Sequence, residues 1–321
     1  MELRTLSLDL ILEAAEFLRN QIIYTPIEYS PGLSEILEVP TYLKLESLQI
    51  TGSFKIRGAL FYVSSLAPHQ KENGIAACSA GNHGLGVAYA ANKMGIRCTV
   101  YLPRNVDPVK KEKIRKLGAE IKESAFVGYD ETLDWAKTEA AKNNQHLISA
   151  FEDERIMAAN GGTIGAEIVE QVEDVQNVLF PVGGGGLGSG ISYYLKEKYP
   201  AIRLIGCQHI DSPGLHLSLQ SGKAMTTLPS IETVAGGLEG GIGARCFDVL
   251  KDRITEVSLA TETEIIQACR WMLGNHQHLI EPSAVVPVAC CLHKKVPKLK
   301  GKTVLVLTGR NIAFSTLQTI I

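Results

Sequence analysis

Apolar and polar positions change their spacing regularly along the chain from residue 74 onward. Short apolar runs predict strands at 74–80, 97–103, 146–150, 177–182, 203–207 and 302–309. Stretches with helical spacing lie between them, at 81–95, 107–121, 129–144, 162–172 and 192–199. Strands that alternate with helices are typical of parallel sheets covered by helices. The pattern therefore predicts an α/β fold with two sheet-and-helix blocks.

Outside these blocks the pattern is different at both ends of the chain. Residues 1–20 carry acidic side chains at helical spacing and lack the features of a signal peptide, so they predict an amphipathic helix. No window approaches the roughly 20 uninterrupted apolar residues of a membrane span, so no membrane partner is expected. The least regular stretch, residues 210–256, is rich in glycine and contains two prolines, which favours a loop over a site.

Composition narrows the class of partner. The chain has 321 residues, 45% of them hydrophobic, and a net charge of −2, so it buries a large core and offers no basic surface for nucleic acid. The expected partner is a small molecule. Seven scattered cysteines in apolar surroundings predict reduced core residues and a cytoplasmic protein.

The strongest local signal is the glycine run that follows the strand at 177–182. Gly183 to Gly186 lead directly into a helix, so successive N–H groups are able to converge on an anion without interference from a Cβ. A tight turn alone needs fewer glycines, and the run predicts phosphate binding. No acidic residue ends the next strand, which reads Gln208-His209, so a dinucleotide is less favoured.

Two other loops follow predicted strands. The segment "SAGNHG", residues 79–84, suits a carboxylate at a helix N-terminus, but an N-cap by Ser79 or Asn82 explains it equally well. His83 alone is more often a packed histidine than a catalyst. The segment "LTGRN", which ends at Asn311, offers a hydroxyl for a ligand or for a helix cap.

Lys55 stands between Phe54 and Ile56, just past a Thr-Gly-Ser turn. One interpretation is a solvated lysine at a helix start, with Ser53 as the N-cap and Arg57 in solvent. The other is an amine in an apolar setting, whose lowered proton affinity allows a Schiff base with an aldehyde cofactor. Together with a phosphate loop, this second interpretation points to pyridoxal phosphate.

The same segments carry a family resemblance. "KLESLQITGSFKIRGA", "SAGNHG", "PVGGGGLGSGI", "IEPSA" and "TGRN" occur in the order of the motifs of fold-type II pyridoxal-phosphate enzymes. The chain resembles the threonine dehydratase and serine racemase group, with a tryptophan synthase β-subunit-like fold. The resemblance implies a large domain of residues 1–52 plus 144–321, a small domain of residues 53–143, and an active site in the cleft between them.

The resemblance also implies residue roles. Lys55 would hold the cofactor as a Schiff base, Phe54 would pack beside the ring, Asn82 would bond its 3'-oxygen, and Thr308 would face the pyridine nitrogen. Backbone amides would bind the phosphate at Gly183, Gly184, Gly185, Gly186 and Leu187. The substrate carboxylate would rest on Ser79, Ala80, Gly81, Asn82 and His83.

The implied reaction is dehydration and deamination of a β-hydroxy L-amino acid, such as threonine or serine, to a 2-oxo acid and ammonia. Lys55 would remove the Cα proton. Racemases of the group carry a serine where this chain has Ala80, so elimination is favoured and a serine racemase-type activity is the alternative. Gly240 and Arg310 also depart from the common pattern and leave larger substrates, such as hydroxyaspartate or phenylserine, open. Arg310 would bind a substrate anion, stabilise an unprotonated ring or point into the core toward Glu281.

The resemblance bears on metal and assembly as well. The family's divalent-cation ligands correspond to Gln208 and Gly214 here, so no metal is expected. The family is commonly dimeric, and a homodimer is therefore expected.

Overall fold

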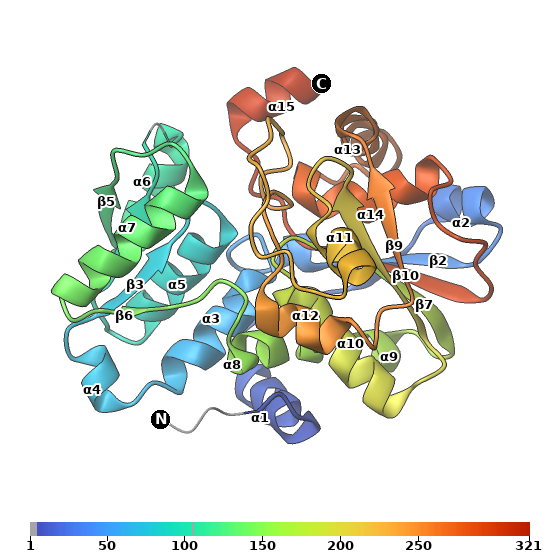
Figure 1. The fold of residues 1–321 in the computed structure, drawn as a ribbon. Coiled ribbons are helices and arrows are strands. Elements are labelled where there is room, and N and C mark those ends of the chain that lie inside the picture. The colour runs from blue at the N-terminus through green and yellow to red at the C-terminus, as the bar shows by residue number, and fades with distance from the viewer. Residues whose placement is uncertain (1–4, 105) are drawn as a thin grey trace.

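The computed structural model describes residues 5–104 and 106–321, and their strands form two sheets (Figure 1). The larger sheet has the order β1-β2-β10-β7-β8-β9 and the smaller β5-β4-β3-β6. The larger sheet contains β1 (Ile27–Tyr29), β2 (Thr41–Leu45), β7 (Val175–Pro181), β8 (Arg203–His209), β9 (Glu256–Ala260) and β10 (Lys302–Leu307). The smaller contains β3 (Ile75–Cys78), β4 (Cys98–Leu102), β5 (Glu120–Glu123) and β6 (His146–Leu147). Every strand pairing among the described residues is parallel except that of β1 with β2, which confirms the predicted α/β class.

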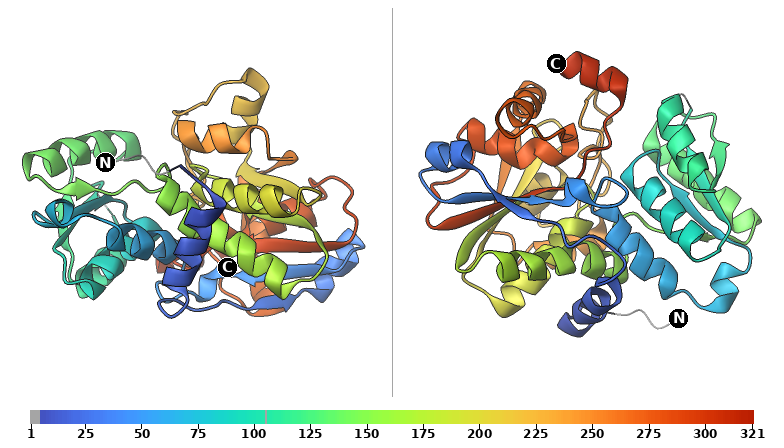
Figure 2. Two further views of the ribbon diagram at one scale, coloured as in Figure 1. Left: turned by 90° about the horizontal axis from the view of Figure 1, so that it is seen from below. Right: turned by 180° about the vertical axis from the view of Figure 1, so that it is seen from behind.

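Helices surround both sheets (Figures 1 and 2). Beside the smaller sheet lie α4 (Pro68–Lys71), α5 (Asn82–Lys93), α6 (Pro108–Lys116) and α7 (Tyr129–Lys142). The others are α1 (Leu8–Leu18), α2 (Pro31–Leu37), the 3-10 turn η1 (Glu46–Leu48), α3 (Lys55–Ser64), α8 (Glu154–Met157), the π-helical turn η2 (Ala158–Gly162), α9 (Thr163–Gln171), α10 (Gly186–Lys198), α11 (Gly214–Ser221), α12 (Ala244–Leu250), α13 (Glu262–His276), α14 (Pro282–Leu292) and α15 (Phe314–Ile320). No helix in residues 5–104 or 106–321 combines the length and apolar character that crossing a membrane requires.

Several predicted elements need correction. The helix predicted at 107–121 ends at Lys116, because Gly118 adopts φ 80° and the chain continues into β5. The strands β1, β2 and β9 were not predicted. The irregular stretch 210–256 contains α11 and α12, and its longest segment without helix or strand is residues 222–243. The seven cysteines are buried and free, as predicted.

The residue range of the smaller domain stays a prediction. Its predicted end at residue 143 falls short of β6, which pairs with β3 through Ile75–His146 and Ala76–Leu147. We therefore propose that the smaller unit extends to about residue 148, where the Ile148 N–H still donates to the Ala76 carbonyl.

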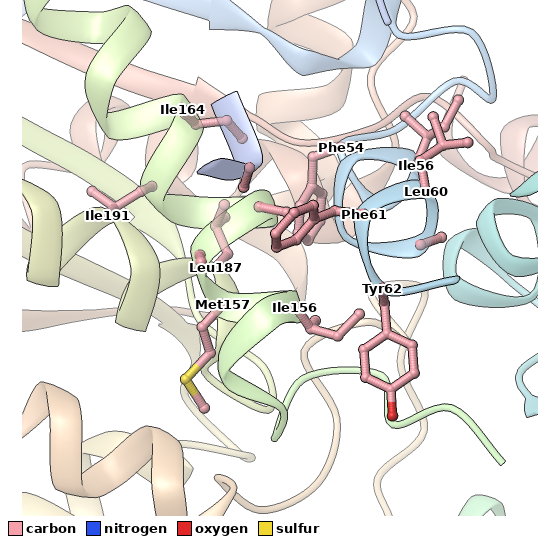
Figure 3. Close-up of a cluster of buried hydrophobic side chains, with 14 of the residues drawn as sticks. Phe54, Ile56, Leu60, Phe61, Tyr62, Ile156, Met157, Ile164, Leu187 and Ile191 are labelled. Carbon is pink, nitrogen blue, oxygen red and sulfur yellow. The ribbon is translucent and has the colours of Figure 1, made fainter. Parts of the chain in front are cut away.

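A hydrophobic cluster joins α3 to the segment 156–164 and to α10 (Figure 3). Phe54, Leu60 and Phe61 come from α3 or its start, and Leu187 and Ile191 come from α10. The π-helical turn packs on α10 backbone to backbone, since a Cβ on Gly161 would lie 2.0 Å from the Leu187 carbonyl oxygen. This contact fixes the start of α10 relative to α3.

Arg57 lies in a buried ion-pair network, so the prediction that it is solvated is wrong. Its Nη2 lies 2.8 Å from Glu46 Oε1, and its Nη1 lies 2.5 Å from Glu167 Oε1. The Lys44 ammonium pairs with Glu167 Oε2 at 2.5 Å. Two cations and two carboxylates balance in charge, which is the condition under which buried ions are tolerated.

Candidate active site

The lysine segment and the end of β10 meet at one place. The Phe54 N–H donates to the Thr308 carbonyl at 3.1 Å, and Ser53 forms a β-bridge with Gly309. The fold thereby brings Phe54, Lys55 and Thr308 together, although some 250 residues separate them in sequence. Lys55 is the first residue of α3, and α5 approaches so closely that a Cβ on Gly86 would lie 3.2 Å from the Lys55 carbonyl.

The predicted N-cap at Ser53 is wrong. Phe54 occupies the cap position without a side-chain hydrogen bond, and its φ and ψ are already helical. The Ser53 hydroxyl is buried and has no hydrogen-bond partner in the described part of the chain. Buried hydroxyls normally have a partner, so this one is free to bond a ligand.

Lys55 sits in the apolar setting that the sequence suggested. Its Nζ donates to the Ala150 carbonyl at 2.7 Å and lies 5.1 Å from the centre of the Phe54 ring. Burial, only partly offset by the neighbouring Cys246 thiol, lowers the pKa of the Lys55 amine to about 8. A large fraction of this amine is therefore neutral, and nucleophilic, at mildly basic pH.

The glycine run forms an anion cradle at the start of α10. Residues 183–187 donate no backbone hydrogen bond to another described loop residue, and the first N–H groups of a helix have no partner within it. Gly185 adopts φ 94°, and a Cβ on Gly184 or Gly186 would lie 2.5 or 2.8 Å from Phe151 atoms. Unpaired amides at the N-terminus of a 13-residue helix suit a phosphate, so these residues fit the cofactor.

Residues 150 and 151 connect the lysine to this cradle. The Ala150 carbonyl accepts from Lys55, the Phe151 ring lies against Gly184, and the Phe151 Cβ and backbone lie against Gly186. The Lys55 amine and the glycine run therefore contact neighbouring residues of one short chain segment. A phosphate-bearing aldehyde would bind the amine through its aldehyde and the glycine run through its phosphate.

The loop 79–83 precedes α5. Its N-cap is Gly81, and no side chain caps the helix; Ser79 instead accepts from the Gly81 N–H at 3.1 Å. The alternative prediction of an N-cap by Ser79 or Asn82 is therefore wrong, and the first amides of α5 stay available for an anion. His83 is buried with Nε2 3.1 Å from the Ile148 carbonyl, and burial followed by the Lys55 charge lowers its pKa to about 3. His83 is a neutral packed histidine, as the sequence favoured.

Two site residues were missed although their motifs were recognised. Asn82 Nδ2 donates to Glu281 Oε1 at 2.6 Å, and Asn82 Oδ1 accepts from Asn311 Nδ2 at 2.7 Å. Glu281 and Asn311 are the two missed residues, and the signal available for them was their position in the motifs "IEPSA" and "TGRN". Arg310, between Gly309 and Asn311, is exposed, so it does not point into the core toward Glu281.

Gln208 has a structural role at the expected cation position. It is buried, its Nε2 donates to the Val182 carbonyl at 3.2 Å, and its Oε1 accepts from the His216 N–H at 3.0 Å. The side chain thus links the end of β7, next to the glycine run, to α11. Within residues 5–104 and 106–321, no group of three or more His, Cys, Asp or Glu side chains is placed to hold a metal ion.

The structure has an α/β fold in which a buried lysine amine and the glycine-rich start of a helix contact the same short segment, residues 150–151. The sequence profile described as "Pyridoxal-phosphate dependent enzyme" matches residues 18–309, and the chain belongs to this family. An L-threonine ammonia-lyase of Geobacter sulfurreducens is 37% identical over 97% of this chain and 77% of its own length. Among solved structures, maize serine racemase is 27% identical with a TM-score of 0.92, covering 98% of this chain and 97% of its own. Threonine deaminase isoform 2 of Solanum lycopersicum is 28% identical with a TM-score of 0.88, covering 98% and 88%.

These likenesses bear directly on the predictions. They confirm the predicted fold type, the cofactor class and the enzyme class, a pyridoxal-phosphate-dependent lyase. The roles of single residues, the substrate and the assembly are proposals.

Proposed function

We propose that this chain dehydrates and deaminates a β-hydroxy L-amino acid such as threonine or serine, releasing a 2-oxo acid and ammonia. The observation that carries the proposal is the position of the Lys55 amine, which donates to the Ala150 carbonyl while Phe151 lies against the glycine cradle. The relatives named for threonine support the substrate class.

Each part of the site has a proposed task. Lys55 would hold the cofactor covalently, with Phe54 beside its ring, Asn82 at its 3'-oxygen and Thr308 at its pyridine nitrogen. The amides of residues 183–187 would bind its phosphate. When bound, pyridoxal phosphate supplies the electron-accepting ring that stabilises negative charge at the substrate Cα.

The substrate is held and deprotonated by the chain itself. The amides of residues 79–83, at the start of α5, bind the substrate carboxylate. The substrate amino group would replace Lys55 on the cofactor, and the freed, neutral Lys55 amine would then remove the Cα proton, for which its pKa of about 8 in the unliganded chain is suited. His83 is not a second base, since its Nε2 faces the Ile148 carbonyl and its pKa lies far below neutral.

We propose elimination rather than racemisation because of Ala80. Racemisation needs a proton donor on the face of Cα opposite Lys55, and an alanine methyl group has no proton to give. Serine racemases are among the structural neighbours, which keeps racemisation as the alternative to be measured.

A dicarboxylic β-hydroxy amino acid is the second candidate substrate. A small cavity next to Ala80 and Gly81 is lined by Lys110 and Lys113, with Asp107 as the only acidic residue. The excess of one positive charge (two lysines against one aspartate) favours a substrate with a second carboxylate, such as 3-hydroxyaspartate.

A substrate panel tests these proposals. Purified enzyme loaded with pyridoxal phosphate is incubated with L-threonine, L-serine, L-threo-3-hydroxyaspartate and L-threo-phenylserine, and both the 2-oxo acid and the D-enantiomer are quantified. We expect the 2-oxo acid to dominate. A dominant D-amino acid would contradict elimination, and absence of both products with all four substrates would contradict the function.

Assembly and compartment follow the same reasoning. We propose a homodimer, as in the family this chain resembles, and a cytoplasmic location, which the seven free, buried cysteines support. Light scattering of the loaded enzyme tests the dimer, and a monomer mass would contradict it.

A further inference from the structure

A chain of hydrogen bonds runs from the turn before Lys55 to α14 through Asn82. Asn311 Nδ2 donates to the Thr51 carbonyl at 2.8 Å and to Asn82 Oδ1 at 2.7 Å. Asn82 Nδ2 in turn donates to Glu281 Oε1 at 2.6 Å. Asn82 begins α5 beside the smaller sheet, whereas Thr51 and Asn311 follow β2 and β10 of the larger sheet and Glu281 is the N-cap residue of α14.

The chemistry of these partners fixes which way each amide points. The Thr51 carbonyl only accepts, so the Asn311 atom facing it must be the NH₂ group. The second hydrogen of that NH₂ meets an oxygen on Asn82, which places the Asn82 NH₂ toward Glu281, again an acceptor. One Asn82 N–H remains, and no second acceptor for it lies within hydrogen-bond distance among the described residues.

The surroundings hold Glu281 in place. Its side chain is buried, and its N–H donates to the Gly309 carbonyl at 3.0 Å. Any side chain at 309 would displace it, because a Cβ there would lie 2.4 Å from Glu281 Oε1 and 3.2 Å from Asn82 Nδ2. The glycine after Thr308 therefore leaves the space in which the carboxylate and the amide meet.

We propose that Glu281 and Asn311 are positioning residues that orient the Asn82 amide so that an N–H, rather than its C=O, faces the 3'-oxygen of the cofactor ring. The proposal rests on the proposed function, in which Asn82 contacts that oxygen. Neither residue touches the reacting atoms. Both act because only one orientation of the Asn82 amide pairs its donor with the Glu281 acceptor and its acceptor with the Asn311 donor. Turning the amide over would place two acceptors against each other at Glu281 and two donors against each other at Asn311.

Two near-isosteric variants test this inference. In Asn311→Asp, a carboxylate oxygen, which only accepts, replaces the NH₂ group that donates to Asn82. In Glu281→Gln, an NH₂ group, which donates, replaces one of the two oxygens of the carboxylate that the Asn82 amide faces. Asn275→Asp is the matched control, since Asn275 is exposed and bonds only the Trp271 carbonyl of its own helix. Each purified apoprotein is titrated with pyridoxal phosphate, and the dissociation constant and absorption maximum of the bound cofactor are measured.

The expected result is a dissociation constant about ten-fold higher for both site variants, the equivalent of one hydrogen bond, together with a shifted absorption maximum. The control stays within about two-fold of wild type with an unchanged spectrum. The spectral shift reports the hydrogen bond at the ring oxygen, which a merely structural role would not move.

Wild-type affinity and spectrum in Glu281→Gln would overturn the inference, even where Asn311→Asp fails to fold. Failure of the proposed function is a separate result, because it is read on the wild type: borohydride reduction of the loaded wild type should label Lys55. Labelling of Lys55 combined with unchanged variants would refute the positioning role alone.

Discussion

The chemistry of single residues in this protein depends on their surroundings. Lys55 and Arg57 lie two positions apart at the start of one helix, yet one is an isolated amine and the other is held by carboxylates. Burial without a counter-charge lowers the pKa of Lys55, whereas Glu46 and Glu167 keep Arg57 charged. Only the first arrangement produces a nucleophile.

The pKa of Lys55 makes a direct prediction for the apoprotein. Acetylation by dilute acetic anhydride requires the neutral amine, so its rate at Lys55 should rise with pH and level off above about 8. Exposed lysines, with unperturbed pKa near 10.4, should keep reacting faster up to about pH 10 and are the internal control. Peptide mass spectrometry measures each site, and a Lys55 profile that follows the exposed lysines would refute the lowered pKa.

Ala80 makes the prediction about reaction type. Ala80→Ser adds a hydroxyl to the loop 79–83, and we expect the ratio of D-amino acid to 2-oxo acid to rise by about ten-fold or more, since a placed proton donor contributes roughly 10²–10⁴. Chiral chromatography of the products measures the ratio. An unchanged ratio, with the variant still active, would remove Ala80 from the argument.

Among the elements, the start of α10 is held by contacts without side chains. Gly161 in η2 packs on the Leu187 carbonyl, and a Cβ on Gly190 would lie 2.0 Å from the Met157 carbonyl oxygen. Both contacts involve backbone atoms, which do not move aside cheaply. The π-helical turn therefore sets where the first amides of α10 lie, which are the amides proposed to bind phosphate.

Two glycine substitutions separate packing from helix propensity. Gly161→Ala forces a methyl into backbone and should cost about 1–3 kcal/mol or more of unfolding free energy while weakening cofactor binding. Gly274→Ala is the matched control, because its Cβ meets nothing within 4 Å in the last turn of α13. There the change should stabilise by up to about 1 kcal/mol.

Urea unfolding of the two apoproteins gives these free energies. Equal effects of the two substitutions would contradict the close packing of η2 on α10.

For the whole molecule, the buried network around Arg57 joins segments far apart in sequence. Lys44 lies on β2, Glu46 on η1, Arg57 on α3 and Glu167 on α9. Burial opposes the charge on Glu46, but Arg57 outweighs it and lowers the pKa of this carboxyl below 4.5. The network therefore anchors the helix that begins with Lys55 to the larger sheet.

Arg57→Met tests that anchor. It leaves Lys44 as the one remaining cation against the two buried carboxylates Glu46 and Glu167 in the described network, and should cost about 3–5 kcal/mol. The control is Arg245→Met. The Arg245 side chain is 46% accessible, so its ion pair with Glu154 is partly exposed and should contribute no more than about 1 kcal/mol.

The pH dependence has a defined sign. A lowered pKa in the folded state stabilises the protein above the unfolded value of 4.5, and this contribution is lost as pH falls. The difference in unfolding free energy between wild type and Arg57→Met should therefore narrow below about pH 4.5. A difference that is constant from pH 7 to pH 4 would refute this role of Glu46.

The sequence by itself determined the alternation of strands and helices and the glycine run at the start of α10, and it predicted the roles of that run and of Lys55. Each of these depends on local periodicity or on the backbone freedom of glycine, which neighbouring residues reveal. It also contained the motifs of Glu281 and Asn311, but nothing local in them indicates that they meet Asn82.

Tertiary structure alone decided the burial of Arg57, the loss of the predicted Ser53 cap, and the link from Lys55 through Ala150 and Phe151 to the glycines. The contacts of Arg57 and the link from Lys55 to the glycines join residues about 10 to 110 positions apart. Local patterns do not report such contacts, because they arise only when two sheets pack and place the ends of their strands together.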